Sequence, residues 1–185
     1  MNKIRSPKKT YLRRVFVLAA LVMAAVFVLS APMADAKKKK LHVVRCAANP
    51  CVGTTGNDRL IGTDLGETIL GFGGNDVYEG NGGGDDLGDG SVTSSDTYVF
   101  KGPDLGNSFV TDCGGSSDTV DLSSTSFRLL DNVTITRDNF SGACGGAASA
   151  DDLTLSGPEG TVKIVDQYGV GKVEKIKFAN GTLTF

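Results

Sequence analysis

The chain has 185 residues, and its first 36 carry six of the 19 basic residues but only one of the 21 acidic ones. The other 149 residues, enough for one compact domain, hold 13 basic against 20 acidic side chains, a net charge of −7. They include one histidine, His42, and no tryptophan, which argues against histidine-based triads, multi-histidine zinc sites and most acid–base catalysis near neutral pH. The acidic balance, with basic residues not gathered beside aromatic ones, also argues against nucleic-acid binding.

Residues 1–36 have the features of a cleavable secretory signal. A basic start is followed by an unbroken apolar run at 15–29 and by small residues at Ala34 and Ala36. This run is shorter than the roughly 20 residues that a membrane-spanning helix needs, and Pro32 interrupts its extension. We therefore expect a secreted, extracellular protein without a membrane span after cleavage. The basic start leaves the general secretory and twin-arginine routes both open.

Residues 37–52 are predicted to form a basic N-terminal arm that contains Cys46 and Cys51. It begins with four lysines at 37–40, which we interpret as a solvated tail. The alternative is adhesion of these lysines to an anionic surface, such as a cell-wall polymer or phospholipid headgroups.

All four cysteines lie after the predicted signal. An even number in an oxidising compartment favours disulfides over a metal cluster. Proximity favours a bond between Cys46 and Cys51, which leaves Cys113 and Cys144 as the second pair. The sequence alone permits three connectivities.

A nine-residue pattern runs without a gap through residues 53–88. Its four units are GTTGNDRLI, GTDLGETIL, GFGGNDVYE and GNGGGDDLG. Position one is always glycine, position six is always acidic, and position eight is always large and apolar. The position-six residues are Asp58, Glu67, Asp76 and Asp85, and the position-eight residues are Leu60, Ile69, Tyr78 and Leu87.

Each column of the pattern has a physical reason. Glycine accepts positive φ at low steric cost, so the first six residues can form a tight turn. The next three residues form a short strand, whose alternation points position eight inward and positions seven and nine outward. Residues 18 apart then stack, which brings Asp58 beside Asp76 and Glu67 beside Asp85. Many carboxylate and carbonyl oxygens in one place favour Ca²⁺, the ion that we expect.

These units resemble the GGxGxDxUx nonapeptides of the RTX, or haemolysin-type, calcium-binding proteins. The resemblance implies a parallel β-roll that holds Ca²⁺ between successive turns, with Asp58, Asp76 and Asp85 as position-six ligands and backbone carbonyls completing each shell. It places Glu67 where the family has aspartate, with Asp64 as the alternative ligand of that turn. Many RTX proteins use an uncleaved C-terminal export signal, so their export route is not carried over to this chain.

Further candidate ligands lie beyond the four position-six acids. Residues 89–100 resemble a degenerate fifth unit whose acid is Asp96, and Asp86 and Asp89 add charge outside the pattern. The predicted metal ligands are Asn57, Asp58, Asp64, Glu67, Asn75, Asp76, Asp85, Asp86, Asp89 and Asp96.

The remaining acids are interpreted mainly as turn caps. Asp118, Asp121 and the pair at 151–152 lie beside turn residues, where an aspartate side chain commonly accepts a backbone hydrogen bond. A further ion at Asp112, Asp118 or Asp121 is the alternative.

Residues 101–185 are predicted to form a β-rich cap. Four nonapeptides make only about two coils, which need capping at their ends. Short alternating segments, with turn signals at 156–160 and 180–181, predict antiparallel strands here. The segments 96–124 and 151–185 also resemble the sequence that follows RTX repeats. The predicted fold is therefore all-β: a short parallel β-roll at 53–100, capped by an antiparallel β region.

The expected function is calcium binding outside the cell. Carboxylates crowded into adjacent turns repel one another without metal, so the roll should fold as it binds Ca²⁺ after export. The alternative is a calcium-stabilised module that adheres to a surface or a polysaccharide. We do not expect an enzyme, because the chain has no HExxH, no GxSxG and no second histidine. A glycosidase that uses only two carboxylates is the remaining enzymatic alternative.

Overall fold

The computed structural model describes residues 40–138, 152–168 and 172–185, which belong to one compact unit, Lys39–Phe185. These residues form fourteen strands and no helix, so the fold is all-β, as the sequence predicts. In these described residues, there is no helix that is long and apolar enough to cross a membrane. The predicted signal at 1–36, the lysines at 37–39, Cys144 and Asp151 lie outside the described residues.

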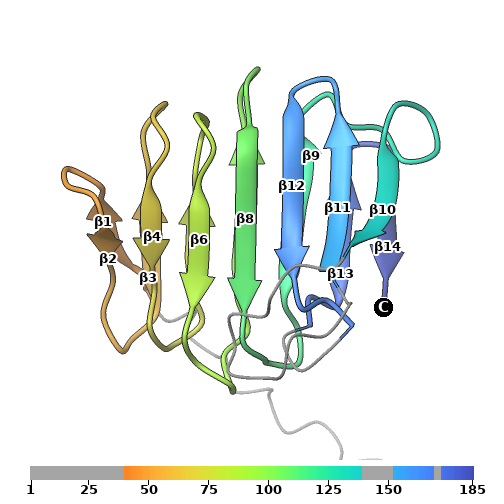
Figure 1. Ribbon diagram of the computed structural model, residues 1–185. Coiled ribbons are helices and arrows are strands. Elements are labelled where there is room, and N and C mark those ends of the chain that lie inside the picture. Colours follow the sequence, from red (N-terminus) through yellow and green to blue (C-terminus); the bar gives the residue numbers. More distant parts are fainter. Residues whose placement is uncertain (1–39, 139–151, 169–171) are drawn as a thin grey trace, which may run out of the picture. The chain divides into compact units, whose positions relative to one another are not determined.

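Consecutive strands alternate between two seven-stranded sheets through the first nine strands. Sheet A has the order β1-β3-β5-β7-β9-β13-β14, and sheet B has the order β10-β11-β12-β8-β6-β4-β2 (Figure 1). Each coil therefore adds one parallel strand to each sheet, which is the geometry of a β-roll. These strands are β1 (His42–Arg45), β2 (Cys51–Val52), β3 (Asp58–Ile61), β4 (Thr68–Leu70), β5 (Val77–Glu79), β6 (Asp86–Asp89), β7 (Thr97–Lys101), β8 (Gly106–Asp112) and β9 (Thr119–Ser124).

The last five strands close both sheets. β12 and β13 pair in parallel with β8 and β9, so parallel stacking continues beyond residue 100. β10, β11 and β14 then add the antiparallel pairs that the sequence predicts, with hairpin turns at 158–159 and 179–180. The five strands are β10 (Thr134–Asp138), β11 (Asp152–Gly157), β12 (Gly160–Val165), β13 (Lys175–Phe178) and β14 (Gly181–Thr184).

The core is a stack of inward-facing side chains. Leu60, Ile69, Tyr78 and Leu87 are all fully buried, which confirms the prediction for position eight. Leu60 pairs with Tyr78 in sheet A, and Ile69 pairs with Leu87 in sheet B, at the predicted spacing of 18 residues. Tyr78 also stacks on Tyr98 of the next coil, with ring centroids 4.8 Å apart. Burial of these large side chains is the main apolar stabilisation of the narrow roll.

Glu79 departs from the expected outward exposure of position nine. Its side chain is buried because Arg59 and Lys101 flank it on the neighbouring strands. Arg59 Nε lies 2.6 Å from Oε1, and Lys101 Nζ lies 2.8 Å from Oε2. Burial alone would raise the pKa of Glu79, but the hydrogen bonds and charges of Arg59 and Lys101 bring it below its ordinary value.

The coils stack so closely that one turn requires glycine. Gly74 has a φ of +101°, a conformation that side chains rarely adopt. A Cβ at this position would lie 2.5 Å from the carbonyl carbon of Gly56 in the preceding coil. The glycine of this turn is therefore needed both for its conformation and for the spacing of adjacent turns.

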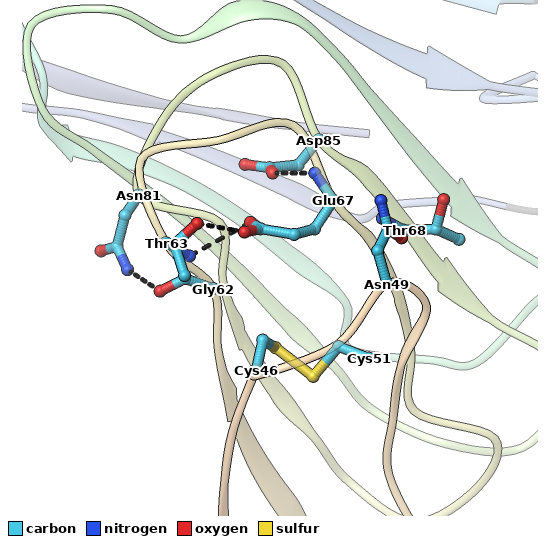
Figure 2. The surroundings of a disulfide bond; sticks show 9 residues. All are labelled: Cys46, Asn49, Cys51, Gly62, Thr63, Glu67, Thr68, Asn81 and Asp85. Carbon is cyan, nitrogen blue, oxygen red and sulfur yellow. Dashed lines mark hydrogen bonds between the residues drawn. A yellow bond between two sulfur atoms is a disulfide. The ribbon is translucent and has the colours of Figure 1, made fainter.

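A disulfide loop covers the N-terminal edge of sheet B. Cys46 and Cys51 are bonded, as their proximity in the sequence predicts, and Cys51 is the first residue of β2. Inside the loop, Asn49 lies beside Thr68 (Figure 2), and its Oδ1 accepts a hydrogen bond from the N–H of Thr68 at 3.0 Å. Asn49 Nδ2 also donates to the carbonyl of Gly66 at 3.4 Å. The loop thus supplies backbone groups of the next coil with partners that a preceding repeat would otherwise provide.

Candidate metal centre

A ladder of acidic side chains runs along the start of the sheet A strands. The backbone N–H of Asp58 donates to Asp76 Oδ1 at 2.8 Å, and that of Asp76 donates to Asp96 Oδ1 at 2.7 Å. The N–H of Asp96 donates to Asp118 Oδ1 at 2.6 Å, and that of Asp118 donates to Glu174 Oε2 at 2.7 Å. The carboxylates of Asp76, Asp96, Asp118 and Glu174 therefore each bind the backbone of the preceding rung through one oxygen. The predicted stacking of Asp58 and Asp76 is present.

The second oxygen of three ladder carboxylates has no partner. The Oδ2 atoms of Asp76, Asp96 and Asp118 are buried and accept no hydrogen bond. Asp58 differs because Thr54 donates to its Oδ2 and the Nδ1 atom of His42 lies 2.8 Å from its Oδ1. A buried ionised oxygen without a partner is unfavourable, so it calls for a proton or a cation.

Asp89 and Asp112 bring two more carboxylates to this end of the roll. They are the last residues of β6 and β8, where the arrowheads of both strands point in Figure 1, and they pair in sheet B. Both side chains are buried. We call five of the buried acids at this end the carboxylate corner: Asp76, Asp89, Asp96, Asp112 and Asp118.

Asp112 is fixed by its neighbours on both sides. Its Oδ1 accepts a hydrogen bond from the N–H of Gly114 at 2.9 Å, and its Oδ2 accepts one from the Tyr98 hydroxyl at 3.3 Å. The next residue, Cys113, is disulfide-bonded, while its predicted partner Cys144 lies outside the described residues.

Three acids of the corner converge on one point. One carboxylate oxygen from each of Asp96, Asp112 and Asp118 lies within 4.8 Å of the other two. All three side chains are fully buried. Two oxygens bound to one Ca²⁺ are separated by up to about 5 Å, because each Ca–O bond is about 2.3–2.6 Å long. These residues therefore form a buried acidic site that can hold a metal ion.

The electrostatics of the corner indicate a missing positive charge. Burial, the largest effect, raises the pKa to about 6 for Asp76 and Asp118, about 7 for Asp96 and about 8 for Asp112. The charge of Asp89 raises the pKa of each of these four acids further. Within the described part of the chain, no ion pair joins Asp89, Asp96 or Asp118 to a basic side chain.

Two buried acids, Glu67 and Asp85, stack at the opposite end of the roll. The N–H of Glu67 donates to Asp85 Oδ1 at 3.0 Å, as the repeat predicts for residues 18 apart. The next rung is Ser108, whose hydroxyl accepts the N–H of Asp85 at 3.1 Å. Burial raises the pKa of Asp85 to about 7. Figure 2 shows that the Glu67 carboxylate turns back within its own coil, where it accepts hydrogen bonds from the N–H and hydroxyl of Thr63.

The other predicted ligands lie outside these two acidic clusters. Asn57 and Asn75 form an amide ladder, because Asn57 Oδ1 accepts the N–H of Asn75 at 3.2 Å and Asn75 Oδ1 accepts that of Ser95 at 3.1 Å. Asp64 and Asp86 are both exposed. The structure thus brings Asp76, Asp89 and Asp96 together in the carboxylate corner, with Asp58 next on the same ladder.

The sequence predicts two residues of the converging triad only as alternative ligands, and it does not predict Glu174, the last rung of the ladder. A further ion at Asp112 or Asp118 is predicted only as an alternative, with a turn cap as the main interpretation of Asp118. Asp121, the third residue of that alternative, lies apart from the triad and contacts Ser123 and Lys177. Asp112 lies outside the nine-residue register. Its only signal in the sequence is the two-residue alternation of its strand, which places Asp112 on the same inward face as Val110.

Comparison of the sequence with known proteins identifies no relative. The chain matches no protein-family model, and no curated protein matches its sequence.

Proposed function

We propose that this protein is a secreted Ca²⁺-binding protein whose β-roll is completed by ions bound in the carboxylate corner. The observation that carries the proposal is the convergence of oxygens from Asp96, Asp112 and Asp118 within 4.8 Å of one another. Burial of these carboxylates, with the Oδ2 atoms of Asp96 and Asp118 unpartnered, supports a bound cation as the missing partner.

The donor atoms favour Ca²⁺ over other common metals. The triad offers only carboxylate oxygens, which suit Mg²⁺, Ca²⁺ and Mn²⁺ better than zinc or copper. Mg²⁺ dehydrates reluctantly and usually keeps several water ligands, which is unfavourable beside three fully buried side chains. Ca²⁺ accepts six to eight oxygens in flexible geometry, so carboxylates and nearby backbone carbonyls are suitable ligands.

We also infer that the chain is a divergent relative of the RTX calcium-binding proteins. The inference is supported by the nine-residue register, by the burial of every position-eight residue, and by the stacking of position-six acids one coil apart. The parallel strands that alternate between two sheets also agree with the β-roll that this resemblance implies.

Calcium would act on folding rather than on catalysis. Without a cation, the acids of the corner repel one another or must bind protons, and both states weaken the roll. At roughly millimolar extracellular Ca²⁺ and an assumed Kd of about 0.1 mM, each ion contributes about 1.4 kcal/mol to stability. The low cytosolic concentration of Ca²⁺ would leave the chain less folded before export. The disulfide between Cys46 and Cys51 supports an oxidising, extracytoplasmic location.

Calorimetric titration of Ca²⁺ into the chelator-treated, oxidised protein tests the proposal. Asp118→Asn removes a triad charge but keeps an oxygen that can accept the N–H of Asp96, so we expect it to lose Ca²⁺ affinity by at least tenfold. Asp131→Asn, at an exposed turn residue, is the matched control and should bind like the wild type. Equal affinities for all three proteins would contradict the assignment of the site.

A further inference from the structure

A groove lies on the outer face of sheet B, near the C-terminal ends of β4, β6 and β8, which are neighbours in the sheet (Figure 1). Gly88 of β6 pairs with Leu70 on one side and with Thr111 on the other, and all three residues line the groove. Because Leu87 is fully buried, alternation along the strand points Gly88 to the outside. The volume of about 320 Å³ lies in the range of small-molecule sites.

Glycine keeps this groove open. A Cβ at Gly88 would lie 3.2 Å from Leu70 Cδ2, so even alanine would narrow the space. Gly90 also lines the groove, and a Cβ there would meet nothing within 4 Å beyond its chain neighbours. The hollow therefore exists because two residues along it carry no side chain.

Phe72 lines the groove in a conformation that is unfavourable for phenylalanine. Its φ is +75°, in the left-handed region that a bulky residue rarely adopts. Burial in the core does not offset this cost, because the side chain is 50% exposed. Asn81, one repeat later, has a φ of +76°, but its side chain donates a hydrogen bond to the carbonyl of Gly62 at 2.9 Å. Strained residues of this kind cluster at ligand sites, and a ligand that covers the Phe72 ring accounts for the conformation.

The charge of the groove selects the kind of ligand. Among the described residues, its lining contains Asp86 and Asp89 but no basic side chain. Asp86 is exposed, and no ion pair of the described residues includes it. Asp89 is buried with its Oδ1 unpartnered. An anion would be repelled here, whereas a cation is attracted both by the carboxylates and by the face of the Phe72 ring.

We propose that this groove binds a small organic cation that carries its charge on an alkylated ammonium group. The Phe72 ring contacts the ammonium group, and the Asp86 carboxylate supplies the opposite charge. The alkyl groups suit the apolar part of the lining, which includes Leu70. Neither Phe72 nor Asp86 belongs to the converging acidic triad, so this site goes beyond the proposed calcium binding.

Titration of choline into the oxidised protein in the presence of Ca²⁺, followed by heteronuclear NMR, tests the proposal. We expect saturable shifts of the amide signals of Phe72, Gly88 and Gly90. The uncharged isostere neohexanol, in which carbon replaces the nitrogen, should bind about tenfold more weakly. Equal binding of the two compounds, or no saturable shift with choline, would overturn the proposal.

Two variants test the residues that carry the site. Phe72→Gly removes the ring and relieves the backbone strain, so it should lose about tenfold in choline affinity while its melting temperature stays the same or rises. Asp86→Asn should lose about threefold in affinity. The controls are Leu65→Ala, at another exposed apolar turn residue, and Asp131→Asn, and both should bind choline like the wild type.

The results for Phe72→Gly decide the role of the ring. Unchanged choline affinity would contradict the assignment of the groove. A lower melting temperature would contradict it as well, because Phe72 would then be kept for the stability of the fold.

Two further ligands distinguish other sources of binding. Phosphatidylcholine vesicles should not sediment the protein, because the described lining offers no basic group for the lipid phosphate. Methyl glucoside, a neutral sugar, should give no saturable shift at the three amides. Binding of the vesicles or the sugar without binding of free choline would overturn the proposal. Calorimetric titration of Ca²⁺ measures the proposed function separately, so the two can fail independently.

Discussion

Asp118 accepts a hydrogen bond from the backbone N–H of Asp96 at 2.6 Å, although 22 residues separate the two in the chain. The same carboxylate keeps its second oxygen buried without a partner and belongs to the converging acidic triad. One aspartate therefore joins two adjacent coils and also places negative charge in the interior. Substitutions that remove the charge but keep the acceptor oxygen separate these two roles.

Asp118→Asn should change stability in opposite directions with and without calcium. In EDTA at pH 7.5 the variant loses like-charge repulsion within the corner, so its free energy of unfolding should rise by about 1 kcal/mol. In saturating Ca²⁺ it should be less stable than the wild type, because the ion loses a ligand. Urea unfolding in both conditions measures the two effects. A variant that is destabilised equally in both conditions would contradict a role of the Asp118 charge in binding the ion.

The metal-free protein should lose stability as the pH rises from about 4 to about 8. Four corner acids, Asp76, Asp96, Asp112 and Asp118, have folded-state pKa values between about 6 and about 8, above their ordinary value of 3.8, and the pKa of Asp89 is raised as well. The folded state therefore binds more protons than the unfolded chain across this range, and its advantage disappears as the carboxyls ionise. Saturating Ca²⁺ should remove or reverse the trend, because the ion competes with protons for the same oxygens.

Urea midpoints at pH 4, 6 and 8, in EDTA and in Ca²⁺, check this pH dependence. The conservative control is Asp131→Asn, whose profile should follow the wild type because the substituted residue is exposed. Metal-free stability that increases steadily from pH 4 to pH 8 would show that the corner carboxyls are stabilised as anions by the protein itself.

Gly74→Ala should destabilise the roll, whereas Gly73→Ala should be nearly neutral. A Cβ at Gly74 would lie 2.5 Å from the Gly56 carbonyl carbon, and the φ of +101° is unfavourable for alanine. A Cβ at Gly73 would meet nothing within 4 Å. We expect a loss of about 2 kcal/mol or more for Gly74→Ala, measured by thermal unfolding of both variants in Ca²⁺. Similar melting temperatures for the two variants would mean that the turns stack less closely.

Removal of the N-terminal disulfide should weaken the first coils. Replacing Cys46 and Cys51 by serine frees the loop that carries Asn49, so the cap on Thr68 and Gly66 is lost more readily. A bridge that closes so short a loop contributes about 2 kcal/mol. Hydrogen exchange should show faster exchange of the Thr68 amide in the double variant, and unchanged protection there would argue against the capping role.

The nine-residue register predicts the part of the fold where the coils are regular. Glycine turns, a buried residue at position eight and an acid at position six require only local spacing, and Leu60, Tyr78 and the contact between Asp58 and Asp76 follow from it. The prediction that Glu79 points outward is wrong, because its burial depends on Arg59 and Lys101, which lie on the two neighbouring strands of sheet A and about 20 residues away in the chain.

The carboxylate corner is less predictable because the coils lengthen along the chain. The separation between ladder partners is 18 residues for Asp58 and Asp76, 20 for the next pair, 22 for Asp96 and Asp118, and 56 for Asp118 and Glu174. No fixed period connects these residues, so their stacking appears only when the sheets are formed. The sequence therefore indicates the kind of chemistry but not which acids converge.

The response of the melting temperature to calcium is the most direct test of the account. The oxidised protein should be melted, with far-UV circular dichroism as the signal, in EDTA, in increasing Ca²⁺ and in Mg²⁺ at the same concentrations. We predict that the melting temperature rises with Ca²⁺ up to the millimolar range, returns to its starting value with EDTA, and changes little with Mg²⁺. A melting temperature that does not change in several millimolar Ca²⁺ would contradict calcium-dependent completion of the β-roll.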